Sequence, residues 1–536
     1  MPLRAVTMGI QSLGSVASTG LSIAAIPVRE GVRAMSGELP VPPPLSRHCW
    51  QGDNRAWIEV RGLDGPHAAE RGRAVLDAVR AYPGVASATL NRPLSRIVVN
   101  LDGDRVSLRD LCKVVDDTEK QVTGFAPGTG AQRSDRSARP KPLPGDGLLL
   151  ATKAVAVGAT ATGMGLALAG RALRWPGLPA SVEAAVAVVD YQPRLRRLLE
   201  DRIGHPATDT VLTVAMTAAH VVSLSPASLA VDLMMETVKA AECRAEAQAW
   251  RRYEPALAAH ADHPDTYPPT RPIPAPEGLV ERHARRSALV QAVGAVVVGA
   301  TTRSIDMAST AALVAAPKAM RTTRESFAAT LGQGLADQHA VLPLRPESLR
   351  RLDRVDALLI DPRVLCTDAL RVVRVRGVRD DELTAAWNRA HVLLDHADLR
   401  SGWHPVAGIP GRRAGSTVEA LICPAHDPLA TAVLAEARRC ELDLISVDVD
   451  VLGELCPAFD ELRSLNDKSV DDALTATLAD LQQSGRIVAV LSSDGAQALS
   501  SADLGLGVMP NSDVAPPPWT ADLILTDLAG AWRVLH

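Results

Sequence analysis

Residues 347–375, ESLRRLDRVDALLIDPRVLCTDALRVVRV, decide how the chain is interpreted. They contain a largely apolar run of β-strand character, residues 355–360, which ends at one carboxylate, Asp361. In a parallel sheet flanked by helices, side chains at the carboxyl ends of the strands face the ligand crevice. Asp361 is therefore placed to act as a nucleophile or a metal ligand in phosphoryl transfer. The alternative is an ordinary strand-ending Asp that begins a turn with Pro362.

Composition limits the class of protein. The chain has 536 residues, a formal net charge of -4 and a pI near 6.4, which allow three or four domains but give no electrostatic footprint for nucleic acid. A mean hydropathy of +0.06 is high for a purely hydrophilic protein and low for a chain that lies mostly in lipid. Aromatic residues make up only 3%, so the cores rely on Ala, Val and Leu, a bias that also suits close helix packing in a membrane. We therefore expect soluble domains joined to a membrane region.

The seven cysteines are scattered along the chain and form no CxxC pair. None has companion histidines at the spacing of metal ligands. The pattern favours reduced, buried thiols in a cytosolic setting, and it argues against a zinc site or a disulfide framework.

Residues 1–50 form an N-terminal segment that ends in a Pro-rich linker at residues 39–45. The apolar stretch at residues 8–28 is interpreted either as an amphipathic helix lying on a membrane or as an ordinary surface helix. Residues 51–123 have the order strand, helix, strand, strand, helix, with Ser107 as the N-cap of the last helix. This order is typical of a small ferredoxin-like unit. Residues 124–146, rich in Gly, Pro, Ser and basic residues, are a linker.

Residues 147–335 carry most of the apolar stretches, which lie at residues 148–170, 184–189, 209–235 and 287–320. Only the first approaches the roughly 20 apolar residues of a spanning helix. The others are expected to form hairpins of short helices or imperfect spans. Two basic clusters would keep the adjoining helix ends cytoplasmic; they are Lys239, Arg244, Arg251 and Arg252, and Lys318, Arg321 and Arg324. A soluble Ala-rich helical bundle is the alternative.

The order of these regions resembles that of the P-type ATPases, in particular the long mycobacterial-type cation-transporting members. The resemblance covers residues 148–536 and is strongest before Asp361 and over residues 500–527. It implies a multi-pass protein of the cell membrane with two cytoplasmic domains. One is a heavy-metal-associated-like domain at residues 51–123, and the other is a haloacid-dehalogenase-like Rossmann phosphorylation domain at residues 336–536. The latter carries a shrunken nucleotide insert at about residues 378–420, and the family would continue with further membrane helices.

The phosphorylation motif of the family, DKTGTLT, is eroded in this chain. By resemblance, Asp361 keeps the nucleophile and Thr367 keeps the last threonine, whereas Pro362 replaces the lysine that screens phosphate charge. Pro362 also removes a backbone donor. Arg363 brings a positive charge one position later, but in an extended segment its side chain is expected to point elsewhere.

The magnesium motif of the family, TGDGxNDxxAL, is reduced here to Asp494 and Gly495, which follow a strand at residues 487–491. By resemblance, Asp494 would hold Mg²⁺ together with Asp361. Gly495, Arg363 and His404 would help to bind ATP, His404 through a His-Pro element at residues 401–405. An ordinary turn Asp is the alternative for Asp494.

Three further family elements are altered. The membrane proline of the ion site is kept as Pro317, but alanines precede it in place of a ligand side chain. Residues 236–286, where the family places its actuator domain, are short and lack the TGE loop. The family's metal-associated domain binds its ion through a GMxCxxC loop, and the corresponding loop here, residues 62–68, has no thiol for a soft metal.

These patterns predict a P-type ATPase-like membrane protein whose catalytic groups have degenerated. Its expected role is the structural or regulatory half of a cation-transporting pump, assembled with another P-type ATPase unit. Mg²⁺ and ATP are its cofactors only if it is active. Two alternatives stay open: an active ATP-driven cation transporter that forms an aspartyl phosphate at Asp361, and a soluble haloacid-dehalogenase-like phosphatase.

Overall fold

The computed structural model describes residues 47–52, 54–63, 67–103, 106–122, 143–177, 179, 181–203, 205–259, 261, 276, 278–316, 318–395, 399–409, 417–510 and 515–536. The chain divides into two compact units, residues 1–262 with 277–337 and residues 263–276 with 338–536. The features expected at residues 8–28 and 39–45, most of the linker at residues 124–146, and Pro317 lie outside the described residues.

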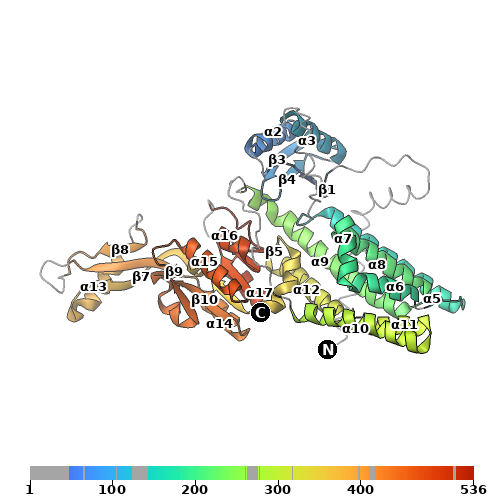
Figure 1. Ribbon diagram of the computed structural model, residues 1–536. Coiled ribbons are helices and arrows are strands. Elements are labelled where there is room, and N and C mark those ends of the chain that lie inside the picture. Colours follow the sequence, from blue (N-terminus) through green and yellow to red (C-terminus); the bar gives the residue numbers. More distant parts are fainter. Residues whose placement is uncertain are drawn as a thin grey trace. The chain divides into compact units, whose positions relative to one another are not determined.

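The first unit begins with a four-stranded antiparallel sheet in the order β1-β2-β4-β3, accompanied by α2 and α3 (Figure 1). The bounds are β1 Cys49–Gly52, β2 Arg55–Glu59, α2 Ala68–Arg80, β3 Val85–Asn91, β4 Arg96–Leu101 and α3 Leu108–Val122. The five elements predicted within residues 51–123 are present in the predicted order. Periodicity does not reveal β1, because four residues that end in Gly give almost no signal. The sheet therefore begins at Cys49, ahead of the expected boundary at residue 51.

The two faces of this sheet have different partners. Buried residues recur at Val75 and Val79 of α2 and at Leu111 and Val115 of α3, a spacing that puts each pair on one helical face. These residues share one core with alternate residues of the strands. The intervening strand residues point the other way and form a separate aromatic cluster around Trp57.

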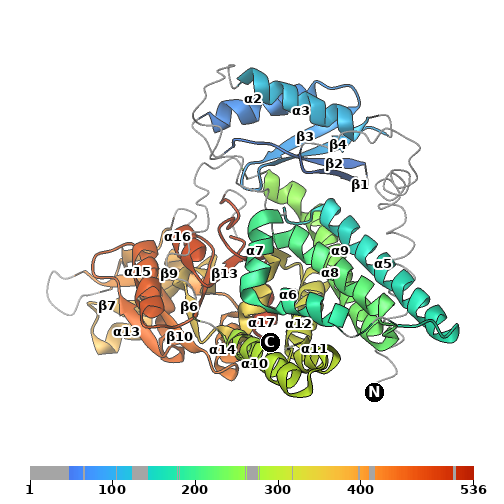
Figure 2. The same cartoon turned by 45° about the vertical axis from the view of Figure 1, so that its right-hand side comes forward.

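A helical region completes the first unit. Its helices are α5 Gly147–Ala172, α6 Ser181–Tyr191, α7 Pro193–Ile203, α8 His205–Val222, α9 Pro226–Ala258, α10 Leu279–Thr302, α11 Ile305–Val314 and α12 Lys318–His339. The helix α5 runs along α8 and α9, and α10 packs beside α11 (Figure 2).

Two of the apolar stretches divide into separate helices. Residues 209–235 divide before Pro226, which suits the first position of α9 but could not continue α8. Residues 287–320 divide at Arg303, whose φ of 51° is left-handed, and Ser304 then caps α11 by accepting a hydrogen bond from the Met307 backbone N–H. Among the described residues, one helix, Leu149–Ala172, is long and apolar enough to cross a membrane. This confirms that only the first stretch has the length of a spanning helix.

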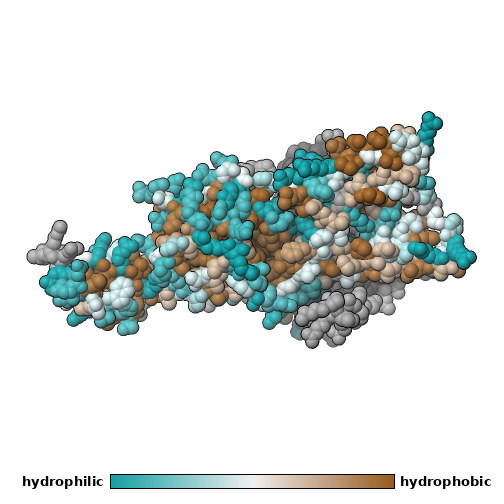
Figure 3. Space-filling view, turned by 90° about the horizontal axis from the view of Figure 1, so that it is seen from below, coloured by the Kyte–Doolittle hydropathy of each residue, from teal (hydrophilic) through white to brown (hydrophobic). Residues whose placement is uncertain are grey.

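Large apolar side chains stay exposed on the helical region, and Figure 3 shows brown patches over it. On α10 they form a stripe of residues that are 52–71% exposed and lie on one helical face. The residues of this α10 stripe are Leu289, Val290, Val293, Val296 and Val297. A continuous exposed stripe of this kind indicates contact with lipid or with another apolar surface.

Residues 236–286, the expected vestigial actuator segment, belong mainly to two helices. The helix α9 continues to Ala258, and α10 begins at Leu279. In the described part of this segment there is no strand and no helix besides these two.

The second unit contains a seven-stranded sheet in the order β11-β10-β6-β12-β13-β14-β5, in which all neighbours are parallel except β14 and β5. The strands are β5 Leu342–Pro343, β6 Ala357–Ile360, β10 Asp443–Asp448, β11 Glu461–Ser464, β12 Val488–Ser492, β13 Leu504–Val508 and β14 Leu523–Leu525. The accompanying helices include α14 Ala430–Arg439, α15 Val470–Gln483, α16 Ala496–Ser501 and α17 Leu528–Leu535. Every residue of β6 is buried, as expected for a parallel strand covered on both faces.

A second, three-stranded antiparallel sheet has the order β7-β9-β8, with α13 beside it (Figure 1). The bounds are β7 Cys366–Arg376, α13 Leu383–Leu393, β8 Gly402–Pro405 and β9 Glu419–His426. The shrunken nucleotide insert was expected at about residues 378–420. The sheet is longer at both ends, because β7 and β9 pair from Cys366 to Arg376.

Candidate functional site

Asp361 lies at the carboxyl end of β6, between β10 and β12. Its backbone N–H donates to the Leu491 carbonyl oxygen at 2.9 Å, which continues the pairing of β6 with β12 for one more residue. The Asp361 side chain is fully buried. The sequence therefore placed this carboxylate correctly at the crevice edge of a parallel sheet.

The turn after Asp361 brings Arg363 back onto the carboxylate. Residues Pro362–Leu365 form a 3₁₀ turn, and the Asp361 side chain caps it by accepting from the Arg363 backbone N–H at 3.0 Å. The Arg363 guanidinium donates from Nε to Oδ1 at 2.9 Å and from Nη2 to Oδ2 at 2.7 Å. The expectation that Arg363 points away is wrong, because the segment is a tight turn and not an extended strand.

Ser492, at the end of β12, is the residue that sequence reasoning missed. Its Oγ donates to Asp361 Oδ2 at 2.6 Å. The same Oγ accepts from the backbone N–H groups of Asp494 at 3.2 Å and Gly495 at 2.8 Å. Ser492 thus links the carboxylate to the loop that carries Asp494. The available signal was a hydroxyl residue at the end of the strand next to β6.

Two more carboxylates surround Arg363. Asp471, in the first turn of α15, accepts a second hydrogen bond from Arg363 Nη2. Burial raises the pKa of Asp494, the negative charges of Asp361 and Asp471 raise it further, and the charge of Arg363 opposes the rise. Burial lowers the pKa of Arg363, but its hydrogen bonds and charge interactions with Asp361 and Asp471 outweigh this, and the net pKa is raised. Arg363 is therefore the shared counter-ion of the carboxylates at this strand end.

The geometry limits what the crevice can do chemically. Both oxygens of Asp361 accept hydrogen bonds from Arg363, and Oδ2 also accepts one from Ser492. A phosphoryl group or a cation would have to displace the guanidinium before it reached these oxygens. Within the described ranges, no group of three or more His, Cys, Asp or Glu side chains is arranged to hold a metal ion. Joint binding of Mg²⁺ by Asp361 and Asp494 stays a prediction.

The structure brings Asp361, Arg363, Asp494 and Gly495 together, but it engages the other two predicted residues elsewhere. The Thr367 hydroxyl, on β7, donates to the Ala425 carbonyl oxygen at 3.3 Å. His404 lies on β8 of the smaller sheet, and its Nε2 is 2.7 Å from the Arg400 carbonyl oxygen. Neither side chain has a hydrogen bond to Asp361 among those found.

The thiol of Cys366, next to Thr367, stays protonated near neutral pH. Burial raises the pKa of its thiol to about 11, and nearby carboxylates and Cys423 contribute to the rise. The thiol is therefore a poor nucleophile at neutral pH, because the thiolate is the reactive form.

A second Arg–carboxylate pair lies in the first unit, between the N-terminal sheet and α9. Arg96 Nε, on β4, donates to Glu254 Oε1 at 2.6 Å, and both side chains are fully buried. Glu254 also accepts from Asn91 Nδ2 at 2.9 Å and from Trp57 Nε1 at 3.0 Å. The aromatic face of the sheet is therefore fastened to α9 by one buried carboxylate.

Arg96 has further partners that complete this contact. Its Nη1 donates to the Pro144 carbonyl oxygen at 2.6 Å. Its guanidinium lies 5.4 Å from the ring centroid of Trp50 and 5.7 Å from that of Trp250, close enough for cation–π attraction. We name Arg96, Glu254 and these aromatic neighbours the sheet clamp. Sequence reasoning missed it because its two ionic partners are 158 positions apart.

No family model matches the chain. Among curated proteins, it is 29% identical to a probable cation-transporting ATPase I of Mycobacterium tuberculosis, over 94% of this chain and 35% of that protein. It is 27% identical to a probable cation-transporting ATPase I of Mycobacterium leprae, over 92% of this chain and 34% of that protein. These similarities support a P-type ATPase family for the chain. The chain spans about a third of the length of these curated relatives.

Solved structures of transport ATPases resemble this chain only distantly. A zinc-transporting PIB-type ATPase in the E2P state is 14% identical, over 70% of this chain and 89% of that chain, with a TM-score of 0.40. A structure of the catalytic domain of the CPx-ATPase CopB-B is also 14% identical, over 36% of this chain and 95% of that chain, with a TM-score of 0.26.

Compared with the resembled motif DKTGTLT, the chain has an Asp at the end of a central strand but different residues around it. Position 362 is Pro, so the lysine of the resembled motif is absent. The positive charge comes instead from Arg363, which is bound to the carboxylate itself. The candidate site is thus a buried strand-end carboxylate that is paired with an internal cation.

Proposed function

We propose that the chain is the structural or regulatory half of a cation-transporting P-type ATPase and that its own phosphorylation site is inactive. The observation that carries the proposal is the Arg363 guanidinium on both oxygens of Asp361. An acylphosphate forms only when a carboxylate oxygen attacks the phosphoryl group. Here the attacking oxygens are fully buried and already paired, so attack would require breaking a charge-assisted, bidentate contact.

The N-terminal domain supports the same proposal. Its strands and helices fit a ferredoxin-like, heavy-metal-associated-like unit in which β1 takes an edge position of the sheet. The loop at residues 62–68 contains no cysteine, and the sheet clamp holds the aromatic face against α9. We infer that the domain serves as a fixed scaffold and not as a carrier of metal ions.

We also propose a multi-pass position in the cell membrane, with the N-terminal and haloacid-dehalogenase-like phosphorylation domains in the cytoplasm. The exposed α10 stripe supports this, since it would be costly in water and favourable in lipid. The long apolar helix Leu149–Ala172 supports it as well. The basic residues near the other helix ends, such as Arg251 and Arg321, fit the cytoplasmic side.

The proposed partner is a second P-type ATPase unit, which would supply the working phosphorylation site with its ATP and Mg²⁺. The test uses membranes of the cells that naturally make the chain, with an affinity tag on the chain. We expect a P-type ATPase polypeptide to co-purify, and we expect the ATP hydrolysis of the complex to be unchanged by Asp361→Asn in the tagged chain. Hydrolysis that disappears in this variant would refute the proposal.

One observation favours a second function, the active cation transporter. Asp494 is exposed and lies close enough to Asp361 for their charges to interact, and the Arg363 side chain that binds both Asp361 oxygens is itself 36% exposed. If Arg363 swings out when ATP and Mg²⁺ bind, Asp361 becomes accessible. The Asp361→Asn measurement separates the two functions.

A further inference from the structure

Three ionisable side chains meet inside the helical region of the first unit. His220, in the last turn of α8, is fully buried. Its ring Nδ1 lies 2.7 Å from Asp232 Oδ2, on α9, and its Nε2 lies 3.0 Å from Glu183 Oε1, on α6. The ring therefore joins α8 to two helices that pack against it (Figure 2). We name Glu183, His220 and Asp232 the histidine bridge.

The two contacts of His220 fix how many protons the bridge holds. A carboxylate oxygen of an ionised Asp or Glu only accepts hydrogen bonds. A neutral imidazole carries one N–H, so it donates to one carboxylate and turns a bare lone pair toward the other. Two hydrogen bonds therefore require one proton more than a neutral ring and two ionised carboxylates supply. The histidine bridge thus holds an additional proton.

Local electrostatics place this proton on His220. The last turn of α8 carries the negative end of the helix dipole, which favours an imidazolium. Glu183 lies in the first turn of α6, where the positive end of the dipole favours a carboxylate. Asp232 Oδ1 is 3.6 Å from Lys318 Nζ, which supplies a second cation. With the proton on His220, two cations face two carboxylates and the charges sum to zero, which avoids a costly net charge among apolar helices.

Charged side chains of the other helices around α8 have ion pairs of their own. Helices α5 and α7 also pack against α8. Lys153 of α5 lies 4.0 Å from Glu236, and Arg196 of α7 is bound to Asp190 at 2.6 Å and to Glu200 at 2.9 Å. The remaining charged side chains described on these two helices are exposed; they are Arg171, Arg197, Asp201 and Arg202. The ion pairs described for the histidine bridge are internal or with the one lysine of α12, so its charge balance depends on the proton.

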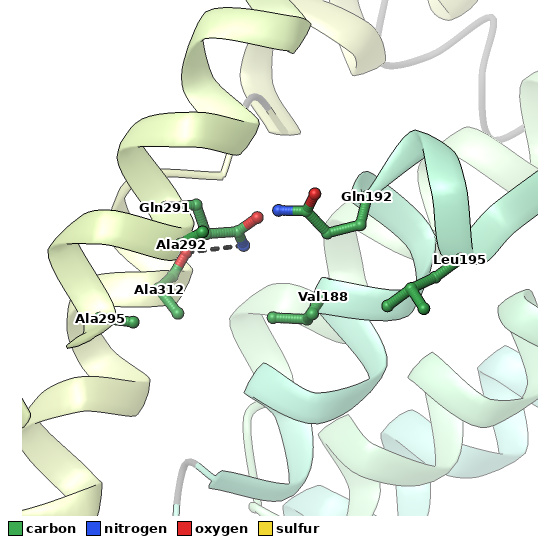
Figure 4. A pocket seen from close by; sticks show the side chains of 7 residues that line it. All are labelled: Val188, Gln192, Leu195, Gln291, Ala292, Ala295 and Ala312. Atoms are coloured by element: carbon green, nitrogen blue, oxygen red, sulfur yellow. Dashed lines mark hydrogen bonds between the residues drawn. The ribbon is translucent and has the colours of Figure 1, made fainter.

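On its other side, α6 borders a hollow of about 310 Å³ that lies between α6 and α7 and the pair α10 and α11 (Figure 4). Val188 of α6 lines this hollow. It follows Glu183 at a spacing that puts it on roughly the opposite side of the helix. The walls are apolar except for Gln192 and Gln291. Helix α6 is thus placed between a polar bridge and an apolar space into which it can move.

We propose that the histidine bridge is a proton-binding site that locks α6 onto α8. When the proton leaves Nε2, the ring keeps its N–H toward Asp232, and its bare nitrogen faces the Glu183 carboxylate. Two acceptors then oppose each other, so this contact opens and α6 moves toward the hollow. The Glu183 side chain is 18% exposed, which gives the departing proton an exit. The inference goes beyond the proposed function and does not depend on it.

The first measurement is the protonation of His220 itself, in the whole chain reconstituted in lipid nanodiscs. Histidine is labelled with ¹⁵N, and the signals that His220→Gln removes identify the two ring nitrogens. Near pH 7 we expect both nitrogens to carry hydrogen, and near pH 10 we expect one of them to be bare. A neutral ring near pH 7, with the proton on a carboxylic acid or absent, would overturn the proposal. So would a ring that is still charged near pH 10.

The second measurement follows the position of α6. Spin-labelled amino acids replace Val182 on α6 and Val222 on α8, both exposed, and their separation is measured. From pH 7 to pH 10 the wild-type separation should increase by about 1–2 Å, the usual size of helix shifts in switching proteins. Glu183→Gln is the matched control. Its amide can donate to the bare Nε2, so the contact persists without the proton and the separation should not change.

A wild-type separation that stays constant, or one that changes equally in Glu183→Gln, would refute the lock. Circular dichroism checks that each variant keeps the wild-type helix content. If Glu183→Gln loses helix, Asp232→Asn replaces it, because its amide can pair with a bare Nδ1 and leaves the N–H at Nε2 for Glu183. None of these results bears on assembly with another pump unit, which the co-purification experiment tests.

Discussion

The two Arg–carboxylate pairs of this chain show how similar chemistry has opposite consequences. Glu254 and Asp361 are both fully buried, and each is bound by one arginine. Arg96 is also fully buried, whereas the Arg363 side chain is 36% exposed and reaches a second, half-exposed carboxylate, Asp471. The first pair fastens one part of the fold to another. In the second pair the arginine is partly exposed and covers the two oxygens of a buried carboxylate, so we call it the Arg363 plug.

Burial also decides what each pair contributes to stability. A fully buried ion pair adds little relative to apolar packing, but breaking it leaves an uncompensated charge. A half-exposed arginine can turn to water when its partner is removed. Mutation of the sheet clamp should therefore lower stability more than mutation of the Arg363 plug. The Arg363 side chain, in turn, should move aside more easily when a ligand binds.

The largest effect is expected from Glu254→Ala in the sheet clamp. The change leaves the Arg96 guanidinium buried without its carboxylate, together with the amide of Asn91 and the indole N–H of Trp57. We expect the free energy of unfolding to fall by about 3–5 kcal/mol, measured by urea denaturation with tryptophan fluorescence. Glu70→Ala, at an exposed site on α2, is the control and should change it by less than about 0.5 kcal/mol. Equal effects would remove the distinction between clamp and surface pairs.

Arg363→Ala should change ligand binding more than stability. The free energy of unfolding is expected to fall by about 1–2 kcal/mol, since Asp361 keeps its bonds to Ser492 and to the backbone. With the plug removed, Mg²⁺ should raise the unfolding temperature of the variant and leave that of the wild type unchanged. The double variant Asp361→Asn with Arg363→Ala is the control and should lose the response. A wild type that Mg²⁺ stabilises as strongly as the variant would contradict the plug.

Ser492→Ala should lower stability by about 1–2 kcal/mol, because the backbone N–H of Gly495 and one oxygen of Asp361 each lose a partner. Ser493→Ala, one residue later and without a hydrogen bond among those found, is the matched control. Chemical denaturation of both variants under the same conditions measures the difference. Equal stability would mean that Ser492 does not organise the crevice.

The smallest effect is expected from Asp494→Asn, and it depends on pH. The folded protein raises the pKa of Asp494, mainly through burial, so the folded state binds this proton more tightly than the unfolded state. Stability from this group is therefore present at low pH and lost as the pH rises through the folded pKa. Asp494→Asn should be more stable than the wild type near pH 7, with the gain vanishing near pH 3. Thermal unfolding of both proteins at both pH values checks this. A stability gain that grows toward acid pH would mean that folding lowers the pKa of Asp494 and does not raise it.

Much of the fold could be predicted because local patterns set it. The apolar run before Asp361 is a buried parallel strand, and the five elements of the N-terminal sheet after β1 follow directly from periodicity and turn residues. The helix breaks at Pro226 and Arg303 were less visible, since an apolar stretch gives no sign of where a hairpin turns. The edge strand β1 is too short to stand out.

The candidate site was only half predictable for a related reason. Asp361 and Asp494 lie at strand ends that sequence patterns locate. The side chains that satisfy Asp361 depend on the turn geometry for Arg363 and on strand pairing for Ser492, and neither follows from spacing along the chain. The sheet clamp depends on packing between distant elements, which the sequence of either element alone does not indicate.

The most direct test of the account is phosphorylation by ATP. Membranes holding the chain are exposed to labelled ATP, quenched in acid, and compared with Asp361→Asn and with a known P-type pump labelled in parallel. The account predicts label on the known pump and none on either form of this chain. Label on the wild type that disappears in Asp361→Asn would show that Arg363 yields to substrate, and it would restore an active transport cycle in place of the structural half.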